Sequence, residues 1–293
     1  MRRLGLSAVV GCFLLAASPA AAAAPTLQPT GKWVVSYSVS QCVAYRDYGT
    51  AEAPLRLLIK APAIGDVFQL TIQSKLLVRS LAAEQIIGSW HINDDSSTQV
   101  STLRMQLGRS PVQSLTFNLD RTALHLPTGS APLVLTAGIL SNQQGFLVSG
   151  MPAVFAALDT CVLSLRKDWN VMPDLMTAWT DTSAAPTLAN APPTPTADGE
   201  LHAQGRVASV FSSDDYPFTA LDRSQSGIAK ALVLIDETGK VADCTLLKSS
   251  GVALLDAQTC SVLQERMRYR PATDRSGKPR RDADSVTIRW VMR

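Results

Sequence analysis

The chain has 293 residues, of which 46% are hydrophobic and 17% are charged, and its formal net charge is +3. This apolar content excludes a disordered chain, which needs low hydrophobicity together with a large net charge. The small net charge gives no indication of a nucleic-acid partner. Three widely spaced histidines, with no cysteine cluster nearby, argue against a multi-histidine metal centre. The length predicts about two domains.

The first 24 residues have the layout of a secretory signal peptide. Two arginines precede an uncharged, mostly apolar stretch from Leu4 to Ala17, and Ala20–Ala24 offers several A-x-A cleavage sites. We therefore expect an exported, periplasmic protein. Two alternatives stay open. Residues 4–24 are long enough to be kept as an inner-membrane anchor, with the chain facing the periplasm, and Cys12 follows a loosely lipobox-like sequence.

Residues 25–181 predict a mainly β domain, either a sandwich or barrel-like. Short apolar runs are divided by Pro, Gly, Asn or Asp, at a spacing typical of these two folds. The runs are Trp33–Val39, Leu55–Ile59, Phe68–Ile72, Thr102–Leu107, Leu115–Leu119 and Leu133–Leu135. Apolar residues at helical spacing between Gly150 and Leu165 predict one helix near the end of this domain.

Residues 182–200 predict a linker rich in Pro, Ala and Thr, without periodicity and extended where polyproline-like. Residues 201–293 predict a second domain with the order α-β-β-α-β, a helix on a small antiparallel sheet. Its expected elements are a short helix from Asp215 to Leu221, strands Ile228–Ile235 and Val241–Leu247, a helix Val252–Met267 and a last strand Ser285–Met292. The expected fold class of the whole chain is α+β.

Four cysteines follow the targeting segment: Cys42, Cys161, Cys244 and Cys260. An even number in an oxidising compartment indicates disulfides, with three possible connectivities. Cys42–Cys161 and Cys244–Cys260 each close a loop inside one domain, whereas the crossed pairings would join domains separated by the linker. We therefore predict these two bridges. For Cys244 and Cys260 the alternative is a pair of buried free thiols.

The chain has no HExxH, G-x-S-x-G, C-x-x-C or glycine-rich phosphate motif. Asp159-Thr160-Cys161 lacks the glycine of an aspartic-protease triplet, and the acidic pairs at 94–95 and 214–215 suit a loop and a helix start. We therefore expect no catalytic residue, no metal and no cofactor. The basic residues between Arg266 and Arg281 indicate a solvated face or, alternatively, a surface for an acidic peptide or a membrane.

Several short motifs follow one another in the second domain: Tyr216-Pro217 with Ala220, a strand-turn-strand over 233–241, Ser249-Ser250-Gly251, Tyr269-Arg270-Pro271-Ala272 and a strand ending in Ile288-Arg289-Trp290. In this order they resemble the C-terminal domain of the TonB energy-transducer family. The resemblance implies that the domain binds an extended peptide of an outer-membrane transporter by strand addition, in energy-dependent transmembrane transport. With the last strand as the candidate edge, the expected partner-binding residues are Tyr216, Pro217, Ser285, Val286, Thr287, Ile288, Arg289 and Trp290.

The sequence departs from that family in its N-terminal half. The apolar segment carries no histidine through which an inner-membrane motor complex would engage, and a β-rich domain with a short linker replaces the family's long Pro/Glu/Lys-rich spacer. Engagement of a motor complex is therefore doubtful, and a homodimer stays open. The alternative function is an exported envelope enzyme or structural protein, in which the β-rich domain acts and the C-terminal domain only docks or dimerises.

Overall fold

A computed structural model of the chain describes residues 26–171, apart from 66, 76–82, 94, 107–111, 121–132 and 140–141, and residues 201–292. We call the first range the N-terminal domain and the second the C-terminal domain. The expected signal peptide and the expected linker lie outside these ranges. Within them, the structure contains no helix with the length and apolar character that crossing a membrane requires.

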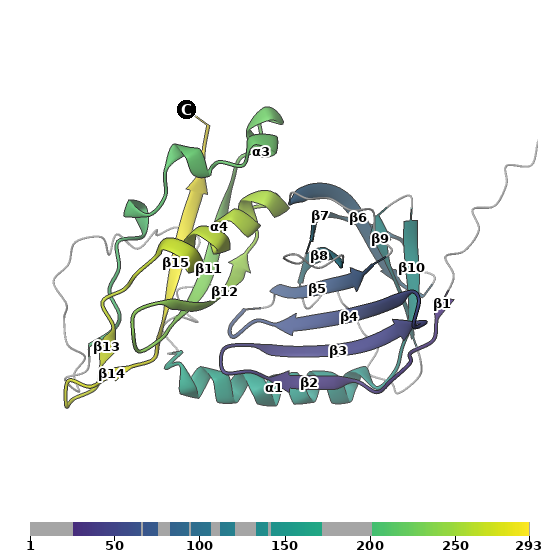
Figure 1. Cartoon of the computed structure of the whole chain (residues 1–293), viewed down its shortest axis with the longest axis horizontal. Helices are drawn as coiled ribbons and strands as arrows, with labels where there is room; N and C mark the ends of the chain where they lie inside the picture. Colours follow the sequence, from purple (N-terminus) through teal and green to yellow (C-terminus); the bar gives the residue numbers. More distant parts are fainter. Residues whose placement is uncertain are drawn as a thin grey trace, which may run out of the picture.

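The N-terminal domain is one curved sheet, a half-barrel, so the barrel-like expectation fits better than a sandwich (Figure 1). In the described ranges its strands are β1 (Thr26–Leu27), β2 (Val34–Tyr37), β3 (Cys42–Gly49), β4 (Pro54–Ala61), β5 (Val67–Ser74), β6 (Glu84–Ile92), β7 (Thr98–Gln106), β8 (Gln113–Asp120), β9 (Leu133–Ile139) and β10 (Asn142–Val148). Their order is β1-β10-β9-β6-β7-β8-β5-β4-β3-β2. Neighbouring strands are antiparallel except β1 and β10.

Alternation of side chains explains the two faces of this sheet. In β5 the residues Phe68, Leu70 and Ile72 are buried, while their neighbours Gln69 and Thr71 point to the other face. Four of the six expected apolar runs fall wholly within strands. The run Trp33–Val39 extends beyond β2 at both ends, and Leu107, the last residue of another run, lies outside the described residues. No expected run falls in β1, β3, β6 or β10, and in the last three charged, glycine or glutamine residues interrupt the apolar pattern.

Helix α1 (Met151–Asp168) covers part of the buried face and confirms the helix expected near the end of this domain. It packs against β2, β3 and β4 (Figure 1). Gly150 precedes the helix in a left-handed conformation, with φ of 73°, which glycine adopts without strain. A disulfide joins Cys161 in α1 to Cys42 at the start of β3, as the sequence predicted.

The C-terminal domain has the expected order α-β-β-α-β. In the described range its elements are the 3-10 turns η1 (Val207–Ser209) and η2 (Ser213–Asp215), α3 (Phe218–Asp222), β11 (Gly227–Ile235), β12 (Val241–Lys248), α4 (Ala253–Arg266), β13 (Ala272–Thr273), β14 (Pro279–Arg280) and β15 (Asp282–Trp290). Strand β11 is the centre of an antiparallel sheet with the order β12-β11-β15. A disulfide joins Cys244 in β12 to Cys260 in α4, again as predicted.

The small sheet of the C-terminal domain is buried on both faces along much of its length. On one face Ala231 and Val233 of β11 cluster with Leu263 of α4 and with Met267, which directly follows α4. On the other face a set of apolar residues belongs to the same buried cluster as the core of the N-terminal domain: Leu232, Leu234, Leu247 and Ala283. The sequence suggested two domains held apart by a linker, but in the structure they share one core.

We expect the double substitution Cys42→Ser/Cys161→Ser to lower the free energy of unfolding by about 4–5 kcal/mol, because the bridge closes a loop of 119 residues. Urea unfolding under non-reducing conditions measures the change. Since the domains share a core, both should lose stability in a single transition. Two separate transitions, with the C-terminal one unchanged, would contradict the shared core.

Candidate functional site: the open edge of the C-terminal sheet

The three-stranded sheet of the C-terminal domain has two edge strands, β12 and β15. They lie differently with respect to the N-terminal domain. Strand β12 lies against the N-terminal domain and contacts β5, whereas β15 lies on the far side of β11 (Figure 1). Among the described residues, the backbone of β15 pairs with β11 only. Its outer edge therefore presents unpaired N–H and C=O groups, to which another strand can add.

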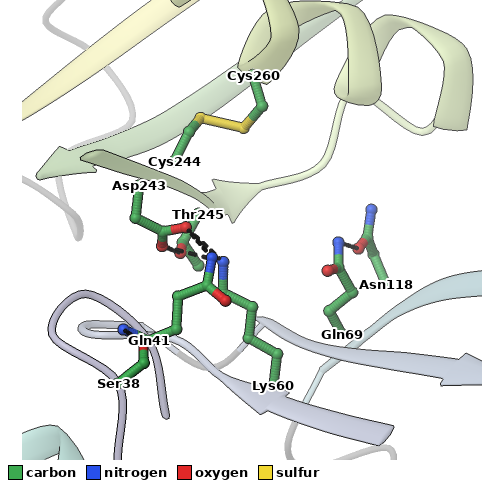
Figure 2. Close-up of polar contacts among 9 residues, drawn as sticks. All are labelled: Ser38, Gln41, Lys60, Gln69, Asn118, Asp243, Cys244, Thr245 and Cys260. Atoms are coloured by element: carbon green, nitrogen blue, oxygen red, sulfur yellow. Dashed lines mark hydrogen bonds and ion pairs between the residues drawn. A yellow bond between two sulfur atoms is a disulfide. The ribbon is translucent and has the colours of Figure 1, made fainter. Parts of the chain in front are cut away.

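A buried ion pair holds β12 against the N-terminal domain. The Lys60 ammonium in β4 lies 2.9 and 3.0 Å from the two carboxylate oxygens of Asp243 in β12 (Figure 2). The Gln41 side-chain amide and the Thr245 hydroxyl also donate to this carboxylate, at 2.7 and 3.0 Å. The side chain of Asp243 is only 4% exposed, so its charge depends on these donors rather than on water.

Helix α4 depends on the N-terminal domain for part of its cap. The side chain of the residue before it, Val252, has no oxygen that could accept a hydrogen bond from the free N–H groups of the first turn. Instead, the Ala253 N–H donates to the Ser101 hydroxyl at 3.0 Å and the Leu254 N–H donates to the Gln85 side-chain carbonyl at 3.3 Å. Strands β6 and β7 thus supply the capping side chains that the C-terminal domain lacks.

Asp282, at the start of β15, joins three segments of the chain. It accepts hydrogen bonds from the Ala203 N–H at 2.7 Å and from the Asn170 amide at 3.2 Å, and it lies 3.1 Å from His202 Nδ1. Burial raises the pKa of Asp282, but these partners, His202 foremost, more than offset it and hold the pKa below its usual range. The beginning of β15 is therefore fixed to the end of α1 and to segment 201–203.

Aromatic packing fixes the other end of β15. The ring of Trp290 makes edge-to-face contacts with Phe211 and Tyr216, with centroids 5.8 and 5.4 Å away. Its indole N–H donates to the Thr259 hydroxyl in α4 at 2.9 Å, and the Tyr216 hydroxyl donates to the Gln225 carbonyl. Both ends of β15 are therefore anchored, while its outer edge between them stays open.

The expected partner-binding residues do not all meet in one place. Ser285–Trp290 all lie in β15, and Tyr216 packs on Trp290, so the structure brings these together. Pro217 precedes α3 and serves as its N-cap residue. Along β15 the side chains of Val286 and Trp290 are buried, whereas those of Thr287 and Arg289 are exposed.

Two members of the basic run from Arg266 to Arg281 pair within the chain. Arg266 pairs with Asp215, and Arg281 lies 3.0 Å from Glu237 and over the Trp169 ring. Most of the other basic residues of this run are exposed, as on a solvated face: Arg268, Arg270, Arg275 and Lys278.

The residues that join the domains were not predicted from the sequence: Gln41, Lys60, Gln85, Ser101 and Asp243. The signal available for Lys60 was a lysine inside the apolar strand β4, and for Asp243 an aspartate inside β12. Neither pattern indicates which residue pairs with Lys60 or with Asp243.

Between the domains lies a cavity of ≈ 230 Å³, lined mostly by polar side chains and by the Cys244–Cys260 bridge. Among the described residues, no three His, Cys, Asp or Glu side chains gather as metal ligands would.

Residues 212–292 match the family model described as Gram-negative bacterial TonB protein C-terminal. The match covers η2, α3, β11, β12, α4 and β13 to β15, and so includes the whole of the open-edged sheet. Searches of curated proteins and of solved structures found no match for the chain.

We expect Lys60→Met to lower the free energy of unfolding by about 3–5 kcal/mol, because it leaves the Asp243 carboxylate buried without its cation. Urea unfolding measures this. The control is Lys32→Met, which removes an exposed lysine and should change stability by no more than about 0.5 kcal/mol. Equal stability of the two variants would show that the ion pair does not hold the domains together.

Because Asp284 in β15 is buried, we expect the free energy of unfolding to depend on pH. Burial raises its pKa to about 6, although the Tyr269 hydroxyl donates to it at 3.1 Å. Between about pH 4 and pH 6 the folded chain therefore holds a proton that the unfolded chain releases, so this group's contribution to stability falls as pH rises through that window.

Asp284→Asn removes this titration and should raise the free energy of unfolding at pH 7 by about 2–3 kcal/mol. It should leave the two proteins similar near pH 4. Urea unfolding of both proteins from pH 4 to pH 7 measures the difference. Parallel stability curves would contradict the assignment.

Proposed function

Because residues 212–292 match the TonB C-terminal family model, we propose that this protein acts in the periplasm in TonB-family energy transduction, by binding an extended peptide of an outer-membrane transporter at β15. The family points to a non-catalytic role for the domain. The observation that carries the proposed binding mode is the open edge of β15, which remains after the N-terminal domain has covered β12. Main-chain hydrogen bonds to an added strand supply affinity in this mode.

The two faces of β15 define the side chains that an added strand would meet. On one face Val286 and Ile288 lie toward α4, and they suit apolar side chains of the peptide. On the other face Thr287 and Arg289 are exposed, and they suit polar or acidic side chains. The proposed peptide therefore alternates apolar with polar or acidic residues along its length.

The N-terminal domain lies against β12, so β15 is the edge that we propose for an added strand. A second copy of the chain could also extend the sheet at β15. A homodimer formed in this way would compete with the transporter peptide for the same edge. Whether the protein also engages a motor complex depends on residues 1–24, which lie outside the described ranges.

Two neighbouring proline substitutions, Thr287→Pro and Ile288→Pro, test strand addition. Consecutive N–H groups of an edge strand point alternately to the neighbouring strand and to the open edge. One variant should break the pairing with β11 and lower stability. The other should keep its stability and lose at least about tenfold in peptide affinity, since it removes an N–H that an added strand needs. If the stable variant binds a transporter-derived peptide as well as the wild type does, strand addition at β15 is wrong.

Site-specific photocrosslinking in cells identifies the partner. A photoreactive amino acid placed at Arg289 should form a covalent product with an outer-membrane transporter, because its side chain is exposed beside the open edge. The matched control is the same amino acid at Leu163, an exposed position on α1. Equal products from both positions, or a product at Arg289 that contains no transporter, would contradict the proposed partner.

A further inference from the structure

Exposed apolar side chains gather at one end of the C-terminal domain. Five large hydrophobic residues there are each at least 40% exposed: Phe218, Leu221, Ile228, Val291 and Met292. Phe218, at 79%, is the most exposed large hydrophobic side chain in the described ranges. Strands β11 and β15 are antiparallel, with Gly227 opposite Trp290, so the start of one strand and the end of the other meet at this end. Figure 1 shows α3 and the C-terminus projecting there together.

Cationic side chains lie on the sheet beside this apolar group. Arg289 is opposite Ile228 across β11 and β15, and Lys248 is opposite Lys230 across β11 and β12. Side chains opposite one another share a face, and positions two apart along a strand do so too. Ile228, Lys230, Lys248 and Arg289 therefore all lie on the face whose other half the N-terminal domain covers through Leu232 and Leu234.

We propose that this end of the molecule, which we call the α3 end and define by the five apolar residues and Lys230, Lys248 and Arg289, docks on an anionic lipid surface. Exposed apolar side chains enter the headgroup region of a bilayer, while flanking lysine and arginine side chains attract anionic headgroups. Such a gathering is unusual on the surface of a soluble protein, where it marks an interaction site.

The shape of the α3 end favours a lipid surface over a protein partner. Its apolar side chains come from three separate segments, namely α3, the start of β11 and the residues after β15. They are exposed, and the cavity described above lies elsewhere, between the domains. A fluid bilayer accommodates separate projecting side chains, whereas a protein partner would need a matching hollow for each one. Helix α3 carries one acidic residue, Asp222, and Arg223 follows it directly.

Sedimentation with vesicles of equal parts phosphatidylglycerol and phosphatidylcholine tests this proposal. The full-length chain should bind these vesicles, and Phe218→Ser or Lys248→Glu/Arg289→Glu should weaken binding at least about tenfold. Added salt should weaken the wild type. The matched controls are Leu163→Ser, which changes an apolar residue on α1 that is 64% exposed, and Lys240→Glu/Lys278→Glu, which makes the same charge change away from the α3 end. Residues 1–24 are common to all variants, so differences between variants report on the α3 end alone.

A nitroxide label locates the contact independently of the N-terminal segment. A label on Phe218→Cys, in a Cys12→Ser background, should become protected from a water-soluble relaxation agent when the anionic vesicles are added, and a label on Leu163→Cys should not. Equal accessibility of both labels, or equal loss of vesicle binding in the test and control variants, would overturn the proposal. Binding of the α3 end to polyglutamate without binding to vesicles would instead assign it to an acidic protein and would also overturn it. The vesicle assays contain no transporter peptide, so they test the α3 end separately from peptide binding at β15, although Arg289 belongs to both surfaces.

Discussion

The buried ion pair between Lys60 and Asp243 is the contact on which the arrangement of the two domains depends. A carboxylate that is nearly excluded from water requires its cation and its hydrogen-bond donors, and all but one of those described come from the N-terminal domain. The pair therefore fixes which strand of the small sheet faces the large one. Once β12 is committed to this interface, β15 is the remaining edge at which the sheet can grow.

The C-terminal domain was largely predictable because its signals are local. Proline and glycine mark its turns, as at Gly239 with φ of 82°, and the face that α4 buries includes Leu255 and Leu263 at helical spacing. The half-barrel was predicted less completely. Strands such as β10, with two adjacent glutamines, are strands because their neighbours pair with them, and no local pattern shows this.

The joint between the domains could not be predicted for a related reason. Ser101 and Gln85 are ordinary polar residues of β-strands until α4 is placed above them. The two disulfides were predictable because both loops close within a domain, but that reasoning also suggested domains that stand apart. A shared core between distant segments is a property of the tertiary structure. It leaves only a weak trace in the sequence, as a lysine or an aspartate inside an apolar strand.

The pairing of the strands also determines how the molecule would carry mechanical load. A pull on a strand added to β15 passes through β11 into β12, and from there through Lys60 and Asp243 into β4 of the half-barrel. Each step crosses a ladder of hydrogen bonds or a buried contact, and the Cys42–Cys161 bridge ties the half-barrel to α1. Tension therefore enters a cross-linked body through its sheet.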